Sequence, residues 1–416
     1  MEPDWVIGGS RPDTEALCTG HDPASVADSA VARRMSVPEI DRTARDLFAE
    51  LGVNSDVPEL GLSAPSTRYT FSTYANANSV SQFEAETLLT WTEAISEVVT
   101  EELDELLGCS AGIVADSCVR SFAERLAALA YRRPATLEEV DELASVYEAL
   151  TLYEAPRIGV RAMVELALLS PHFIYHSVDT RSGTSGPFTP YALASRLSYF
   201  MWGTMPDARL RQLAADDALQ SADEVRAIAL TMLDDPRART VLRQFHAELL
   251  YLSAPDGIIR DPERYPLFNS DVAGDMRREF ETFIDETAGA GGGLEMLLTS
   301  DEVFANSRLE ELLGLEEHSN GPNDWSRHSV TDRSGLFGRP LFLASADSLI
   351  LRGVTVIEKL MCTTLNVPDD TFDEIAEQQA AESNGALTVL GAVEARAANN
   401  QCSSCHIAID AFGLSM

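Results

Sequence analysis

The sequence has 416 residues, of which 45% are hydrophobic and 23% are charged, as expected for a globular protein of about two to four domains. There are 66 acidic residues against 31 basic ones, and the formal net charge of −35 argues against nucleic acid and anionic membranes as partners. A solvated acidic surface explains this charge better than an acidic docking face for a basic partner. No apolar run is long enough to predict a membrane span.

The pattern of hydroxyl, glutamate and apolar residues predicts helices from residue 36 onward. A Ser or Thr precedes a Glu by three residues in four capping boxes, at Ser36 and Glu39, Ser81 and Glu84, Thr136 and Glu139, and Ser221 and Glu224. Helical spacing of apolar residues predicts buried faces at Phe122, Leu126 and Leu129, and at Leu193, Leu197, Phe200 and Met201, the latter in a helix that Thr189 and Pro190 begin. No alternating run indicates a strand. We therefore expect an all-α, multi-domain helical bundle.

Glycine and small polar residues mark the breaks between the helical regions. They cluster at residues 179–190, 288–293 and 316–329, and an acidic stretch at 370–386 leads towards the C-terminal residues. From these breaks we expect four domains, at residues 1–110, 111–180, 187–315 and 330–416. No strand is predicted before the glycines at 289–293, so they do not form a dinucleotide-binding motif.

Four cysteines bear on the redox compartment. Cys109 and Cys118 lie nine residues apart around a glycine-containing loop between two helical patterns, which suits a local disulfide. Cys18 and Cys362 are candidates for a long-range pair that the sequence does not establish. The alternative is that all four are buried thiols in a reducing cytosol.

The C-terminal residues contain the motif Cys-Ser-Ser-Cys-His. Its spacing is that of a c-type haem attachment site, in which Cys402 and Cys405 bind the porphyrin vinyl groups and His406 is an axial iron ligand. This predicts one covalent haem c and a C-terminal c-type haem motif segment. A thioredoxin-like redox pair needs a preceding strand in an α/β domain, and a zinc site needs two further ligands, neither of which the sequence predicts.

Other residues offer a second iron ligand or a separate metal site. Met416 has a soft sulfur, and His172 and His176 lie four apart, which predicts that they share one helical face and could bind a metal or supply a distal imidazole. The alternative for this pair is two surface or interface histidines. We expect His246 to pack in a core, and His21, His318 and His328 to lie in polar or terminal segments. No hydrolase, protease or phosphate-binding motif is present, so no catalytic residue is predicted.

Five segments in order resemble the planctomycete-type cytochrome c family, large multidomain bacterial proteins of unknown function. These are residues 120–136, which contain Arg-Arg-Pro, 193–210, which contain Leu-Ser-Tyr-Phe-Met-Trp-Gly, 297–315, 333–362 and 402–414. The resemblance implies a C-terminal haem motif and no assigned activity. This chain has Ala411 where the family usually has a proline after its aspartate, here Asp410. Relatives continue beyond the motif, and no secretory signal is visible at the start, so we expect a chain cut at both ends.

Three classes of function follow. The first is an extracytoplasmic c-type cytochrome, in the periplasm or at the cell surface, that transfers electrons to an unknown redox partner alone or as a module of an oxidoreductase. The second is a haem peroxidase or oxygenase with an open distal position. The third is a helical scaffold with a vestigial haem motif. Two axial ligands favour the first and one favours the second, whereas the third retains no haem.

Overall fold

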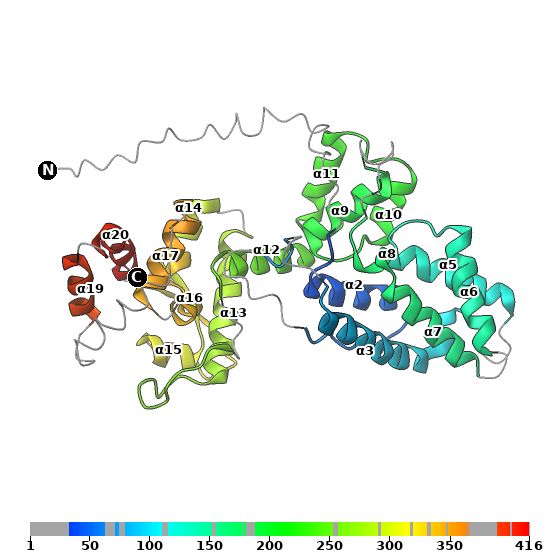
Figure 1. Cartoon of the computed structure of the whole chain (residues 1–416). Coiled ribbons are helices and arrows are strands. Elements are labelled where there is room, and N and C mark those ends of the chain that lie inside the picture. Colours follow the sequence, from blue (N-terminus) through cyan, green and yellow to red (C-terminus); the bar gives the residue numbers. More distant parts are fainter. Residues whose placement is uncertain are drawn as a thin grey trace. The chain divides into compact units, whose positions relative to one another are not determined.

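The computed structural model describes residues 33–62, 71–74, 80–109, 115–151, 155–177, 179, 188–252, 257–289, 293–316, 319–330, 334–346, 348–363, 365, 389–399 and 402–415. These residues are mostly helical (Figure 1). The chain divides into two compact units, Met1–Val241 and Leu242–Met416, here called unit 1 and unit 2. The four-domain division stays a prediction. In the described part of the chain, no helix is both long and apolar enough to span a membrane.

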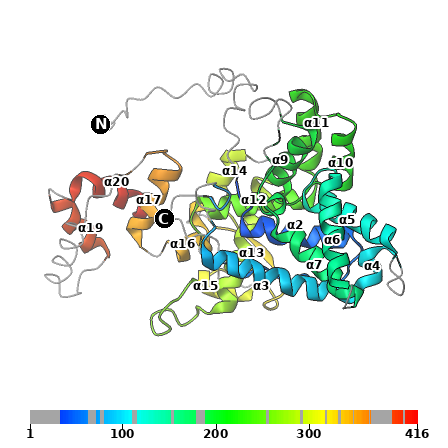
Figure 2. The same ribbon diagram turned by 45° about the vertical axis from the view of Figure 1, so that its right-hand side comes forward.

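Unit 1 is a set of helices around one main core and one smaller core. Its helices are α2 (Val37–Glu50), α3 (Gln82–Val99), η3 (Thr100–Glu102), α4 (Leu103–Leu107), α5 (Asp116–Ala130), α6 (Leu137–Thr151), α7 (Pro156–Leu169), α8 (Pro171–Ile174), α9 (Pro190–Trp202), α10 (Ala208–Ala215), α11 (Ala222–Met232) and the first part of α12 (Pro236–Leu249). In Figures 1 and 2, α7 lies beside α3 and α6. Phe122 and Leu126 of α5 are fully buried and Leu129 is partly buried, which confirms the predicted face.

The predicted capping residues begin their helices. Glu39 accepts a hydrogen bond from the Ser36 N–H over 2.7 Å at the start of α2. In the other three boxes the glutamate N–H also donates to the hydroxyl oxygen, at Ser81 and Glu84, Thr136 and Glu139, and Ser221 and Glu224. Thr189 caps α9, whose first residue is Pro190. These predictions are confirmed because each cap depends on residues no more than four positions apart.

The predicted helix after Pro190 is present as α9, but its buried face differs in part from the predicted one. Leu197 and Met201 are buried, whereas Phe200 is 77% exposed, so its predicted place in the core is wrong. The helix instead turns small residues inward, with Ala194 at 1% and Ser198 at 0% exposure. Small side chains let the backbone of α9 approach its neighbours closely, and this displaces the buried face away from Phe200.

Unit 2 contains the remaining helices and a small sheet. Its elements are α13 (Ser270–Thr287), α14 (Gly293–Thr299), β1 (Glu302–Ala305), α15 (Ser307–Leu313), β2 (Ser326–Ser329), η5 (Leu336–Gly338), α16 (Pro340–Ser345), α17 (Leu349–Lys359), α19 (Val389–Ala398) and α20 (Ser403–Leu414). β1 and β2 pair antiparallel, with Val303 opposite His328. The expected helical fold is confirmed in its main part, and this small sheet is an addition that the sequence did not predict. Strands of four residues are too short to show alternation, and their pairing joins segments far apart in sequence.

A buried ion pair lies in the core of unit 2. Arg339 and Glu279 are both 0% exposed, and Arg339 Nη1 donates to Glu279 Oε1 over 3.0 Å and to the Glu302 carbonyl oxygen over 2.6 Å. The guanidinium also lies over the ring of Phe283, 4.3 Å from its centroid. Burial raises the pKa of Glu279 to about 7 although Arg339 opposes the shift. Desolvation of the carboxylate therefore outweighs its pairing with one cation.

One predicted disulfide is present in unit 1. Cys109, just after α4, is bonded to Cys118 in the first turn of α5, and their Cα atoms are 6.6 Å apart. The bond therefore connects two consecutive helices. Cys362 is an exposed thiol, and Cys18 lies outside the described residues.

We expect the double variant Cys109→Ser and Cys118→Ser to lower the free energy of unfolding by about 2–3 kcal/mol, because the cross-link restricts the unfolded chain. Urea unfolding of the oxidised full chain, followed by circular dichroism, measures the loss. Addition of a reductant to the wild-type protein should produce a similar decrease. Unchanged stability of both samples would contradict a stabilising bond.

Glu279→Gln should change how stability depends on pH. The folded pKa of Glu279 is raised to about 7 from an ordinary value of 4.5, so its proton favours the folded state. This contribution is fully present below about pH 4.5 and is lost as pH rises through 7, by about 3 kcal/mol. The wild-type protein should therefore lose stability relative to Glu279→Gln across this window, as measured by unfolding at a series of pH values. Parallel curves for the two proteins would show that Glu279 titrates normally.

Candidate functional site

Helix α20 carries the C-terminal motif on its first turn. Cys402 is the N-cap residue, and the N–H groups of Cys405 and His406 donate to its carbonyl oxygen over 3.3 and 3.0 Å. Residues three and four positions apart lie on the same face of a helix. Cys402 therefore lies next to both Cys405 and His406 across the first turn of α20, whereas Cys405 and His406 are consecutive residues that point in different directions around the helix.

The three groups of the motif differ in exposure. Cys402 is 7% exposed, Cys405 is exposed, and the side chain of His406 is 22% exposed. Thioether formation requires a vinyl group to reach both sulfur atoms. If a haem were attached here, the packing around Cys402 would have to open to let the vinyl group reach its sulfur atom.

A carboxylate holds the imidazole of His406, and a guanidinium in turn holds that carboxylate. Asp410 lies one turn further along α20, and its Oδ1 is 3.2 Å from His406 Nδ1. Its Oδ2 accepts a hydrogen bond from Arg396 Nε of α19 over 2.8 Å. A carboxylate paired with arginine only accepts hydrogen bonds, so the hydrogen of this contact belongs to His406 Nδ1. The other ring nitrogen, Nε2, is then available to bind a metal.

Helix α20 packs against α17, and the orange and red helices of Figures 1 and 2 lie side by side. Two glycines lie at this contact. A Cβ at Gly353 of α17 would lie 1.9 Å from the Ile409 carbonyl oxygen, and a Cβ at Gly413 of α20 would lie 2.1 Å from the Leu349 carbonyl oxygen. Neither distance is possible for a real side chain. The two helices therefore pack backbone against backbone, and this contact determines where the motif lies.

The residues of α20 fit a c-type haem by their chemistry. Cys402 and Cys405 would form the thioether bonds, and His406 Nε2 would bind the iron while Asp410 holds the opposite side of the ring. When bound, such a haem would supply one-electron chemistry at this face of α20. Neither Asp410 nor Arg396 was predicted from the sequence as a residue of this site. The spacing of four residues between His406 and Asp410 was a usable signal, whereas Arg396 comes from another helix and had none.

The predicted pair of His172 and His176 does not share a helix face. Helix α8 ends at Ile174, and His176 follows in extended backbone. His176 is buried, with Nε2 3.6 Å from Glu39 Oε1, whereas the side chain of His172 is 59% exposed. Burial lowers the pKa of His176 although Glu39 opposes the shift. The predicted shared helical face is therefore wrong, because α8 ends two residues before His176.

The predicted locations of the remaining histidines are confirmed for His246 and wrong for His328. His246 is 6% exposed and its Nδ1 bonds to the Leu242 carbonyl oxygen over 2.9 Å, which confirms a packed histidine. His328 was expected in a polar loop, but it lies in β2 and is 8% exposed, with Nε2 3.0 Å from Glu310 Oε1. That expectation is wrong because the pairing of β2 with β1 buries it. His21, His318 and Met416 lie outside the described residues.

Among the described side chains, no group of three or more His, Cys, Asp and Glu residues is arranged to hold a metal ion alone.

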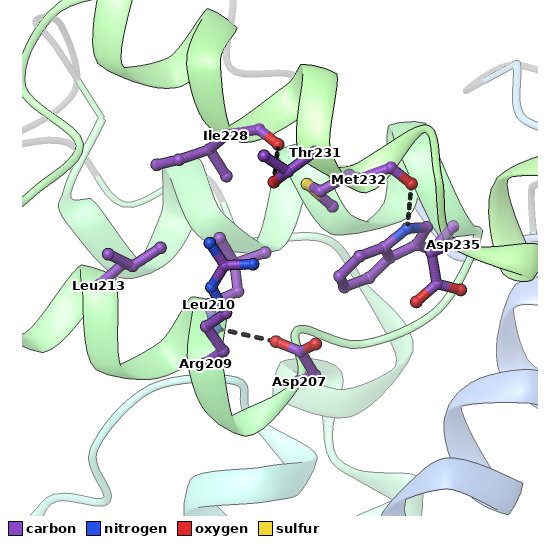
Figure 3. A pocket seen from close by; sticks show the side chains of 9 residues that line it. Asp207, Arg209, Leu210, Leu213, Ile228, Thr231, Met232 and Asp235 are labelled. Atoms are coloured by element: carbon purple, nitrogen blue, oxygen red, sulfur yellow. Dashed lines mark hydrogen bonds between the residues drawn. The ribbon is translucent and has the colours of Figure 1, made fainter.

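A pocket in unit 1 lies between α10 and α11 (Figure 3). It has a volume of about 110 Å³, and its lining combines apolar side chains with Asp207 and Asp235. Asp207 caps α10 through the Leu210 N–H over 2.8 Å, and Asp235 binds Arg237 over 2.7 Å. Because the protein itself uses both carboxylates, we treat the pocket as part of the packing of α9 to α11.

We expect Gly353→Ala to separate α17 from α20 and to cost about 1–3 kcal/mol of stability, because the new Cβ would meet the Ile409 carbonyl oxygen. Gly274→Ala in α13 is the matched control, since a Cβ there meets nothing within 4 Å. It should stabilise the protein by about 0.5–1 kcal/mol through the higher helix propensity of alanine. Thermal unfolding of both variants tests the contact, and equal effects would argue against it.

Comparison with protein families gives three matches along the chain. PSD5, a protein of unknown function (DUF1595), matches residues 118–177, and PSD4, a protein of unknown function (DUF1592), matches residues 188–315. PSCyt3, a protein of unknown function (DUF1588), matches residues 333–416, which include α17, α19 and α20. No curated protein and no solved structure matches the chain. The resemblance noted in the sequence is confirmed, and the chain belongs to the planctomycete-type cytochrome-associated family, with PSD5, PSD4 and PSCyt3 domains in that order.

Proposed function

We propose that the protein is a c-type cytochrome that carries one covalent haem on α20 and transfers electrons outside the cytoplasm. Cys402 and Cys405 bind the haem, and His406 is an axial ligand of the iron. The observation that carries the proposal is the placement of Cys402 at the N-cap of α20 and of Cys405 and His406 in its first turn, with the ring of His406 held by Asp410.

Two further observations support this function. The PSCyt3 match covers the motif, and the name of that domain suggests a cytochrome-like module. The disulfide between Cys109 and Cys118 is a bond that persists in oxidising compartments, where c-type haem is attached in bacteria. The redox partner is proposed only as a protein or small molecule that exchanges single electrons, because no described surface identifies it.

The number of axial ligands separates electron transfer from small-molecule chemistry. A second axial ligand would complete the coordination of the iron and favour electron transfer, whereas an open position would favour a peroxidase or an oxygenase. The absorption spectrum of the haem-loaded protein in its ferric and ferrous states distinguishes these coordination states. We propose the first, in which the spectrum is that of a six-coordinate haem.

Co-expression with a bacterial haem-attachment system tests the proposal. The full chain, directed to the periplasm, should gain the mass of one haem per chain in intact mass spectrometry, and the haem should remain after denaturation. The double variant Cys402→Ala and Cys405→Ala should lose all covalent haem. His406→Ala should reduce haem content, because the axial ligand holds the iron during attachment.

Cys362→Ala is the matched control, because Cys362 is an exposed cysteine outside the motif. It should retain the full haem content. The proposal fails if the wild-type chain carries no covalent haem, or if the motif variants and Cys362→Ala carry equal amounts.

A further inference from the structure

The contact of His406 with Asp410 is shielded from water. Asp410 is 2% exposed, and its two oxygens are both engaged, Oδ1 with His406 Nδ1 at 3.2 Å and Oδ2 with Arg396 Nε at 2.8 Å. The charge of a buried carboxylate is screened far less than that of an exposed one. Asp410 is therefore placed to act electrostatically on whatever His406 binds.

A carboxylate that accepts the Nδ1–H of a histidine makes the ring a stronger electron donor through Nε2. Ferric iron has one more positive charge than ferrous iron, so it gains more from a strong donor and from a nearby negative charge. Both effects favour the oxidised state. Asp410 alone would therefore lower the reduction potential of a haem bound by His406.

Arg396 acts in the opposite direction. Its guanidinium binds the second oxygen of the same carboxylate, so it offsets part of the negative charge and weakens the pull of Asp410 on the Nδ1–H. Its side chain is 19% exposed and comes from α19, a different helix from the motif. The arginine also restrains the carboxylate in the orientation that His406 requires.

We propose that Asp410 and Arg396 are positioning residues that set the reduction potential of the haem, Asp410 by lowering it and Arg396 by limiting the decrease. This inference rests on the proposed function, because it requires a haem bound by His406. It predicts that Asp410 and Arg396 have opposite effects on the reduction potential of the haem.

Spectroelectrochemical titration of the haem-loaded full chain tests the inference. Asp410→Asn removes the charge at nearly constant shape and should raise the potential, with about a tenfold higher ratio of ferrous to ferric haem at a given solution potential, or about 59 mV for one electron. Arg396→Gln should lower the potential. Arg396→Lys, which keeps the positive charge, should stay close to the wild-type value.

The directions of the shifts in reduction potential distinguish this role from a merely structural one. Looser packing would admit water, favour the more highly charged ferric state and lower the potential in all three variants. A rise for Asp410→Asn and a fall for Arg396→Gln would support the proposal. Equal potentials, or a fall in every variant, would overturn it while leaving the proposed function intact if haem is attached. If Asp410→Asn does not fold, the comparison of Arg396→Gln with Arg396→Lys decides, and absence of haem from the wild-type protein overturns both proposals.

Discussion

The close approach of α17 and α20 is the constraint on which the candidate site depends. Gly353 and Gly413 are reciprocal, since each removes a side chain where the other helix presents a backbone carbonyl group. The helices can therefore cross at a distance that side chains would not allow. This crossing orients α20 and thereby the turn that holds Cys402, Cys405 and His406. Helix α19 packs on α20 as well and brings Arg396 to Asp410.

The buried positive charges of this acidic protein are carried by arginine side chains. Apart from Lys359, all 31 lysine and arginine residues are arginines, and three of these, Arg34, Arg132 and Arg339, are almost fully buried. Arg132 shows the reason, because its guanidinium donates to four backbone carbonyl groups, those of Ala130, His172, Phe173 and Tyr175. A planar group with five N–H donors can tie several segments together, whereas an ammonium group has three donors on a flexible stem.

Two buried glutamates show how the number of donors decides protonation. Glu39 is 2% exposed and Glu279 is 0% exposed, so burial raises the pKa of both. In Glu39, His176 and Arg33 outweigh burial and hold the pKa at about 2, and the Ser36 N–H adds a further donor. Burial of Glu279 outweighs the charge of Arg339 and the hydrogen bonds from Arg339 and the Phe304 backbone, so its pKa rises to about 7. Its Oε2 makes no hydrogen bond within the described part of the chain. Similar burial thus produces opposite protonation behaviour.

The sequence by itself determined the features that arise within a few residues. The caps at Ser81, Thr136 and Ser221 follow from spacing within one helix turn, because a turn places such residues together wherever the helix lies. The disulfide between Cys109 and Cys118 joins residues only nine positions apart, across the loop between two consecutive helices. The tertiary structure alone decided the pairing of β1 with β2, the burial of His328 and the exposure of Phe200, and it brought Arg396 to Asp410. Each of these depends on segments that meet only after folding. Local periodicity indicates which residues share a face, but not which other segment covers that face. The contact of Arg396 with Asp410 therefore became visible only when α19 and α20 were packed together.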